Sequence, residues 1–138
     1  MHHGYYATGE TNRTKDRRQA QIDLIEQVLA WALPEHKLPE LGVAPKILDV
    51  GCGIGGSSIY LAQKYGADQV QVTGITLSPV QAARASQRAI AHQVDDRANF
   101  QVADAMAMPF SDASFDLIWS LESGEHMPDK AEFLQECY

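Results

Sequence analysis

The chain has 138 residues, a length that fits one domain with a single hydrophobic core. Hydrophobic residues make up 45% of it and charged residues 21%, as in ordinary globular proteins. The formal net charge of −7 argues against electrostatic binding to nucleic acid, so we expect no nucleic-acid partner.

Cysteine usage and hydropathy narrow the class of protein further. Cys52 and Cys137 suggest no disulfide framework, which favours a reducing compartment, with the cytoplasm as the default. No apolar run approaches the ~18 residues of a membrane span, so we expect no integral membrane segment and no signal peptide. We also expect no bound metal.

The N-terminal part predicts an arm followed by a helix. Residues 1–14 are polar and irregular, and the adjacent Tyr5 and Tyr6 are expected to anchor this arm or to form a lid over a ligand. Apolar residues at helical spacing predict a helix over residues 15–32. Pro34 and Pro39 end that helix, and residues 41–45 lead into the first strand.

Residues 47–58 form the segment around which the rest is organised. An apolar run around Asp49 predicts a strand, a Gly-rich turn follows, and a helix over residues 57–65 comes next. Gly51, Gly53 and Gly56 fit the pattern G-x-G-x-x-G, a weak indication of a nucleotide-like cofactor. Strand, turn and helix together direct backbone N–H groups and a helix N-terminus at a ligand.

The acidic residue before the turn indicates which cofactor fits. A carboxylate at Asp49 would repel a pyrophosphate but suits a cofactor that carries positive charge. S-adenosylmethionine has a sulfonium and an ammonium against one carboxylate, so it fits better than NAD. The alternative is that Asp49 is a solvated or helix-capping residue.

Three further strands and two further helices follow. Strands are predicted over residues 70–75, 99–103 and 115–120, and helices over 79–93 and 129–138. Gly66 is expected to cap the helix before it, and Ser78 with Pro79 to begin the next one. Strands that alternate with helices predict an α/β fold with a parallel sheet.

Each strand is followed by a polar or Gly-rich segment. These segments are residues 49–56, 76–81, 104–106 and 122–126. Since the carboxyl ends of parallel strands meet at one edge of the sheet, we expect all four segments to line one binding site.

The same segments resemble the class I methyltransferases that use S-adenosylmethionine, and more narrowly the tocopherol C-methyltransferase family with its alkaloid N-methyltransferase relatives. The matching stretches are residues 1–6, 49–58, 74–81, 100–105 and 122–130. The resemblance implies a Rossmann-like parallel sheet that is truncated after the fourth strand and preceded by an N-terminal helix. It divides the chain into an arm or lid, 1–14, and the N-terminal part of a cofactor-binding domain, 15–138.

The resemblance also assigns roles. Asp49 with Gly51, Cys52 and Gly53 would hold the methionine end of the cofactor. Asp104 would accept from the adenine amino group, and the backbone N–H of Ala105 would donate to the ring.

The ribose position departs from the general pattern of the superfamily. Most members have an acid at the end of the second strand, whereas this chain has Thr76 followed by Leu77, as in the tocopherol group. Gln81 can supply the missing acceptor and a donor besides, unless it lies on a solvated helix face.

Candidate catalytic residues follow the fourth strand. A phenolic acceptor, with a pKa of about 10, calls for a base. His126 is the first candidate, with Glu122 or Glu125 orienting it or binding the acceptor. The alternative is that His126 caps the following helix and the glutamates only shape the loop.

The sequence does not distinguish among three candidate functions. They are ring C-methylation of a tocopherol-like phenol, N-methylation of a small amine, and cofactor binding without catalysis. A prenylated phenol as acceptor would favour a plastid or membrane-peripheral site over the cytoplasm. Family members continue well beyond this length, so we expect this chain alone to be inactive, with an unpaired sheet edge open to self-association.

Overall fold

The structure is a computed structural model that describes residues 3–33, 44–66 and 70–138. The chain divides into two compact units, Met1–Glu40 and Leu41–Tyr138, which are described separately. This division does not test the predicted boundary between residues 14 and 15, which stays a prediction. The expected helix stop at Pro34 and Pro39 and most of the predicted lead-in over 41–45 lie outside the described residues.

In the first unit an arm packs on one helix, α1 (Arg17–Ala32). The backbone N–H of Tyr5 donates to the carbonyl oxygen of Ala20 at 2.7 Å. Gly4 approaches so closely that a Cβ there would lie 2.8 Å from the Cβ of Ala20. The helix starts two residues later than predicted, because the Asp16 side chain accepts from the N–H of Gln19 and caps it. The arm is thus anchored on α1, and its role as a lid stays a prediction.

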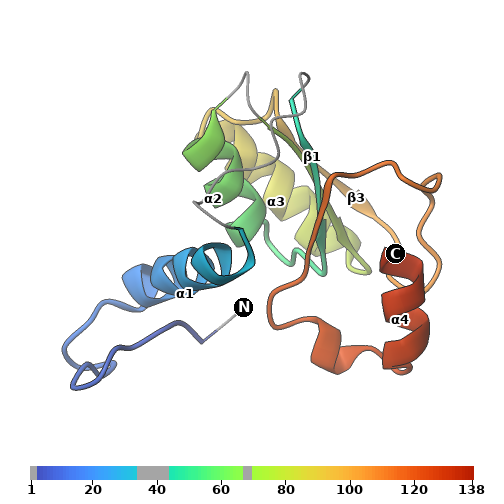
Figure 1. Ribbon diagram of the computed structural model, residues 1–138. Coiled ribbons are helices and arrows are strands. Elements are labelled where there is room, and N and C mark those ends of the chain that lie inside the picture. The colour runs from blue at the N-terminus through green and yellow to red at the C-terminus, as the bar shows by residue number, and fades with distance from the viewer. Residues whose placement is uncertain (1–2, 34–43, 67–69) are drawn as a thin grey trace. The chain divides into compact units, whose positions relative to one another are not determined.

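The second unit contains a four-stranded parallel sheet (Figure 1). Its strands are β1 (Lys46–Val50), β2 (Gln71–Thr76), β3 (Ala98–Val102) and β4 (Leu117–Trp119), in the order β3-β2-β1-β4. Every pairing is parallel, which confirms the predicted α/β fold class. The chain winds outward through β2 and β3 and then returns to the other side of β1. The topological switch point therefore lies between β1 and β4.

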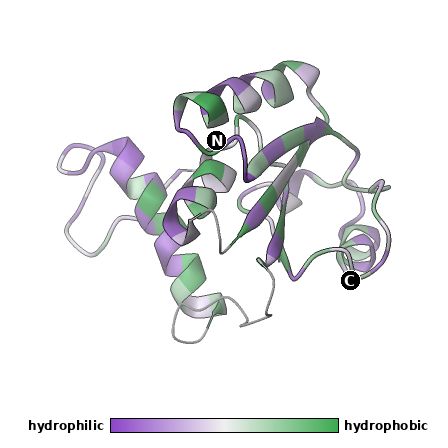
Figure 2. Ribbon diagram, turned by 90° about the horizontal axis from the view of Figure 1, so that it is seen from above, coloured by the Kyte–Doolittle hydropathy of each residue, from purple (hydrophilic) through white to green (hydrophobic). Residues whose placement is uncertain are grey.

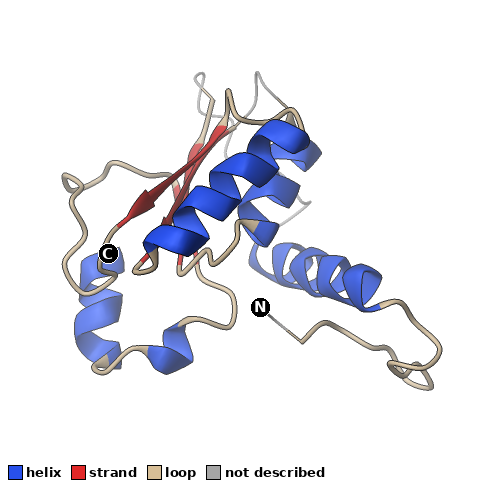
Figure 3. Ribbon diagram, turned by 180° about the vertical axis from the view of Figure 1, so that it is seen from behind, coloured by secondary structure: helices blue, strands red, loops and turns tan. Residues whose placement is uncertain are grey.

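Helices cover both faces of this sheet. The helices α2 (Gly56–Tyr65) and α3 (Pro79–Ala91) contact each other and lie against β2. The short η2 (Gly124–His126) and α4 (Lys130–Cys137) follow β4, and Figure 3 shows α3 and α4 on opposite sides of the strands. As predicted, Ser78 caps α3 by accepting from the N–H of Gln81, and Pro79 is its first residue.

Side chains of β1 alternate between the two faces. Leu48 and Val50 join a buried cluster with Ile75 of β2 and Phe133 of α4. Asp49 points the other way and contacts α2. Figure 2 shows hydrophilic and hydrophobic residues interspersed along the strands and around α3. Because Leu48 and Val50 pack with α4 and Asp49 contacts α2, β1 is covered on both faces, as an interior strand of a parallel sheet requires.

The fourth strand is shorter than predicted. Residues 115–120 were expected to be extended, but only Leu117–Trp119 pair with β1. Phe115 instead packs edge-to-face on Phe110, and Ser120 turns away to hydrogen bond with Ser123. The outer edge of β4 pairs with no strand among the described residues, as expected; self-association through it stays a prediction.

Candidate functional site

The Gly-rich turn joins the carboxyl end of β1 to α2 and is fastened to β2. The carbonyl oxygen of Ile75 accepts from the N–H groups of Gly51 and Cys52, at 3.0 and 2.9 Å. Gly51 and Gly53 have φ of +76° and +56°, which favours glycine at both. A Cβ at Gly53 would meet nothing within 4 Å, so the backbone there faces open space. A ligand could therefore approach this part of the turn closely.

The third glycine with a structural requirement is not the one that the motif indicated. Gly55, with φ of +75°, has the Phe100 ring against it, and a Cβ there would lie 2.7 Å from its Cζ. Phe100 also fills the space above Gly74. Gly56, by contrast, begins α2 and would tolerate a Cβ without contact. Gly55, and not Gly56, is therefore the glycine whose missing side chain lets the turn pack closely against Phe100 of β3.

Asp49 is buried beside this turn. Its side chain is 3% exposed and accepts from the hydroxyl of Ser58 at 2.5 Å. Burial raises the pKa of Asp49 to about 6, although the hydroxyl and N–H of Ser58 act in the opposite direction. Burial and the nearby Asp49 also raise the pKa of the Cys52 thiol to about 12. The site therefore holds one desolvated carboxylate, and a bound cation would favour its charged form.

Thr76 and Gln81 are brought together at the end of β2. The Thr76 hydroxyl donates to Oε1 of Gln81 at 2.8 Å and accepts from the N–H of Ser78 at 3.3 Å. With Oε1 engaged in this way, the amide NH₂ group of Gln81 remains as a donor. Leu77 is 70% exposed and adds an apolar surface beside this pair.

Asp104 follows β3 next to Thr76. The N–H of Ala103 donates to the Thr76 carbonyl oxygen at 3.1 Å, so the two strand ends stay together. The Asp104 carboxylate is exposed and accepts from the N–H of Met106 at 2.9 Å, while Ala105 is buried. One carboxylate oxygen of Asp104 thus stabilises the local turn. Because the residue is exposed, its other carboxylate oxygen is accessible to a ligand.

The segment after β4 is fixed against the Gly-rich turn through Ser123. A Cβ at Gly51 would lie 2.5 Å from the Cβ of Ser123, so the two backbones approach closely. Ser123 also bonds Val50 and Ser120, at 2.7 Å each. Glu122, just before it, has φ of +49°, an unusual conformation for a residue with a side chain. The segment after β4 is therefore held beside the Gly-rich turn by the contact of Ser123 with Val50 and Gly51.

The side chains of the candidate catalytic residues Glu125 and His126 are exposed, unlike Ser123, which contacts the Gly-rich turn. Glu125 and His126 lie in η2, where residues 124–126 were predicted as loop, and both side chains are more than half exposed. Nε2 of His126 lies 3.9 Å from Oε1 of Glu125. Their catalytic roles stay predictions.

Sequence analysis missed four residues that shape this site: Ser58, Phe100, Ser123 and Arg88. Arg88 of α3 donates to the Ile54 carbonyl oxygen at 2.6 Å and braces the turn. Ser58 and Ser123 could have been noted as hydroxyl residues beside predicted strand ends. The positions of Phe100 and Arg88 depend on how β3 and α3 pack, which no local pattern reveals.

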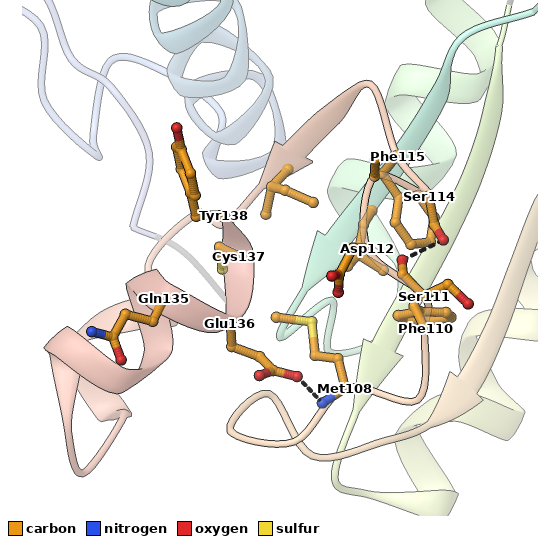
Figure 4. Close-up of a pocket in the computed structure, with 13 residues that line it drawn as sticks. Met108, Phe110, Ser111, Asp112, Ser114, Phe115, Gln135, Glu136, Cys137 and Tyr138 are labelled. Atoms are coloured by element: carbon orange, nitrogen blue, oxygen red, sulfur yellow. Dashed lines mark hydrogen bonds between the residues drawn. The ribbon is translucent and has the colours of Figure 1, made fainter.

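A separate pocket lies on the face of the sheet opposite α2 (Figure 4). It has a volume of about 170 Å³ and lies between residues 110–115, which precede β4, and the end of α4. Glu136 accepts from the Met108 N–H at 2.5 Å at its rim. None of the predicted site residues lines this pocket.

Comparison with known proteins identifies the family. Residues 47–138 match the family described as methyltransferase domain. The chain is 53% identical to a probable tocopherol O-methyltransferase of Oryza sativa subsp. japonica and 51% identical to the tocopherol O-methyltransferase of Arabidopsis thaliana, both chloroplastic by name. It is 39% identical to ajmaline N-methyltransferase of Rauvolfia serpentina. Each match covers 99% of this chain but only 36%, 38% and 45% of the respective relative, so the chain spans less than half their length.

Solved structures show the same fold. The [4+2]-cyclase SpnF has a TM-score of 0.80 at 31% identity, over 99% of this chain and 46% of that one. A geranyl diphosphate methyltransferase in complex with SAM has a TM-score of 0.62 at 29% identity, over 88% of this chain and 47% of that one. Among residues 3–33, 44–66 and 70–138, none of the helices combines the length and the apolar character that a membrane span requires. The turn, the sheet order and these matches agree: the chain belongs to the methyltransferase domain family.

Proposed function

We propose that the protein binds S-adenosylmethionine at the carboxyl ends of β1, β2 and β3 and transfers its methyl group to a small molecule. The observation that carries this proposal is the buried carboxylate of Asp49 next to the open backbone at Gly53. A desolvated carboxylate beside a Gly-rich turn fits a cationic cofactor and not a pyrophosphate. The solved methyltransferase in complex with SAM, which shares this fold, supports the same cofactor.

Each end of the cofactor has a candidate partner. Asp49 and the turn at Gly51, Cys52 and Gly53 would bind the methionine end. Thr76 presents Gln81, whose amide would donate to the ribose hydroxyls, and Leu77 would cover an apolar part of the ligand. Asp104 and the N–H of Ala105 would recognise the adenine, because a carboxylate accepts from its amino group.

When bound, S-adenosylmethionine supplies a methyl group on a sulfonium. Methyl transfer is an in-line displacement, so the contribution of the protein is largely positioning. The segment 122–126 extends from the Ser123 contact on Gly51, which places it beside the turn. Glu122, Glu125 or His126 would accept the hydroxyl proton of a phenol from this segment.

The acceptor that we propose is a tocopherol-like phenol, methylated on a ring carbon. The identity to two tocopherol O-methyltransferases over nearly the whole chain supports a tocopherol-like acceptor. Transfer to a ring carbon rests on the family resemblance of the sequence, because both names specify O-methylation. N-methylation of a small amine is the second candidate, supported by the identity to ajmaline N-methyltransferase. Cofactor binding without methyl transfer is the third, since a cyclase shares the fold. The chloroplastic names of two relatives favour the plastid alternative over the cytoplasm.

A labelled-methyl assay distinguishes these candidates. The protein is incubated with methyl-labelled S-adenosylmethionine and either a chromanol or a secondary amine, and cofactor binding is measured in parallel by calorimetry. Label in the chromanol ring supports our proposal, and label on the amine supports the second candidate. Because this chain alone is expected to be inactive, binding without transfer supports the third candidate only in a protein that extends this chain to the length of its relatives. Absence of cofactor binding to folded protein contradicts all three.

A further inference from the structure

The Gly-rich turn is closed by a hydrogen bond between residues on either side of it. Asp49 precedes the turn in β1, and Ser58 follows it in the first turn of α2. The Ser58 side chain is fully buried, and its hydroxyl donates to Oδ2 of Asp49 at 2.5 Å. A hydroxyl in this position fixes the direction of the carboxylate and stabilises its charge.

The surroundings of Asp49 offer little other compensation for a negative charge. Its register partners in β2 and β4 are Gly74 and Trp119, which are uncharged. The nearby thiol of Cys52 stays neutral, because its pKa is raised to about 12. Among the described residues, the interactions that lower the pKa of Asp49 both come from Ser58, through its hydroxyl and its backbone N–H.

We propose that Ser58 is a positioning residue for cofactor binding: its hydroxyl keeps the Asp49 carboxylate charged and directed toward the methionine end of S-adenosylmethionine. This inference rests on the proposed function. In this proposal Ser58 does not contact the cofactor; it supports Asp49, which does.

The proposal predicts a particular pH dependence. Burial raises the pKa of Asp49 and the hydrogen bond from Ser58 lowers it, so removing the hydroxyl moves protonation of Asp49 to higher pH. A cationic cofactor binds the charged form. For a pKa change of about one unit, Ser58→Ala should therefore weaken S-adenosylmethionine binding about fivefold at pH 6 and hardly at all at pH 8.5. The ammonium of the cofactor titrates alike for every variant, so it cancels from the comparison.

Calorimetric titration with S-adenosylmethionine from pH 5.5 to 8.5 tests this on wild type, Ser58→Ala and Ser58→Cys. The cysteine variant keeps the buried volume and donates a weaker hydrogen bond, so it serves if the alanine variant does not fold. The matched control is Ser57→Ala, which removes a neighbouring buried hydroxyl and should keep the wild-type profile. A loss of affinity that is equal at every pH, or no loss, in the Ser58 variants overturns the proposal.

An Asp49→Asn variant separates this inference from the proposed function. If Asn flattens the pH profile but the Ser58 variants keep the wild-type profile, only the role of Ser58 is wrong. If Asp49→Asn keeps wild-type affinity and wild-type pH dependence, the assignment of Asp49 to the cofactor is wrong, and the role of Ser58 falls with it.

Discussion

The hydroxyl of Ser123 donates to the backbone carbonyl oxygen of Val50 at 2.7 Å, joining the segment after β4 to the last residue of β1. Ser120 adds a second hydroxyl at 2.7 Å from that of Ser123. The carbonyl at the end of β1 is thus satisfied by a side chain from a different part of the chain. The segment with the candidate catalytic residues is held at the Gly-rich turn by this contact.

Removing this hydroxyl should loosen that segment. We expect Ser123→Ala to increase amide hydrogen exchange of residues 120–127, because it breaks the contact to Val50 and leaves the carbonyl without this donor. The matched control is Ser114→Ala, which removes a hydroxyl that bonds the Ser111 carbonyl in a loop at the other end of β4. Hydrogen exchange read by mass spectrometry measures both. Equal protection of residues 120–127 in wild type and Ser123→Ala would show that the contact does not hold the segment.

Two glycines of the turn should respond differently to alanine. Gly51→Ala should lower the free energy of unfolding by about 2–4 kcal/mol, since a Cβ would adopt φ of +76° and lie 2.5 Å from Ser123. Gly53→Ala meets no protein atom and should cost only about 1–2 kcal/mol, for its positive φ.

Gly53→Ala should affect cofactor binding more than it affects folding. In the proposed site its Cβ would enter the space for the ligand, so the free energy of S-adenosylmethionine binding should fall by more than the free energy of unfolding does. Urea unfolding and calorimetry on both variants measure this. Wild-type cofactor affinity in Gly53→Ala would remove this glycine from the site.

Asp49→Asn should stabilise the protein without cofactor at neutral and higher pH. The pKa of Asp49 is about 6 in the folded state against 3.8 for an ordinary aspartate, so ionisation costs the folded state stability as the pH rises through 6. That difference corresponds to about 3 kcal/mol, absent below pH 4 and fully expressed above pH 7. Asn removes this cost while keeping an acceptor for Ser58.

Unfolding in urea at pH 4 and pH 8 checks this prediction. The variant should equal wild type at pH 4 and exceed it by about 2–3 kcal/mol at pH 8. If Asp49 serves only as a cap for α2, its charge favours the helix N-terminus and the variant should be less stable at pH 8.

Gln81→Ala should weaken S-adenosylmethionine about fivefold, which corresponds to one lost hydrogen bond of about 1 kcal/mol. Affinity for methionine alone should stay the same, because Gln81 is assigned to the ribose. Gln87→Ala, an exposed glutamine of the same helix, is the control. Wild-type cofactor affinity in Gln81→Ala would return this residue to the solvated surface.

Local patterns were sufficient for much of this fold. The structure confirms three elements that short sequence patterns predicted. Glycines adopt the positive φ of the turn after β1, Ser78 and Pro79 begin α3, and the apolar run before the turn forms β1. Since the carboxyl ends of parallel strands lie at one edge of the sheet, the location of the four segments at that edge could be expected from the predicted parallel sheet; that they line one binding site stays a prediction.

Other features depend on contacts between distant residues. Gly55 needs a glycine because Phe100, 45 positions along the chain, packs against it, and the motif pattern had favoured Gly56. Sequence indicated the charge of Asp49 and left helix capping open as an alternative. That its carboxylate accepts from Ser58, nine positions along the chain, depends on how α2 packs against β1. The fourth strand was predicted too long because apolar Phe115 reads as strand, but it packs on Phe110 instead.

The claim that this site binds S-adenosylmethionine is tested most directly by calorimetric titration of wild type, Asp49→Ala and Asp104→Ala at pH 8. Circular dichroism first establishes that each variant is folded. The two carboxylates are assigned to opposite ends of the cofactor, so each substitution should weaken binding by about 1–3 kcal/mol, roughly 5- to 150-fold. Unchanged affinity in both folded variants would contradict the account.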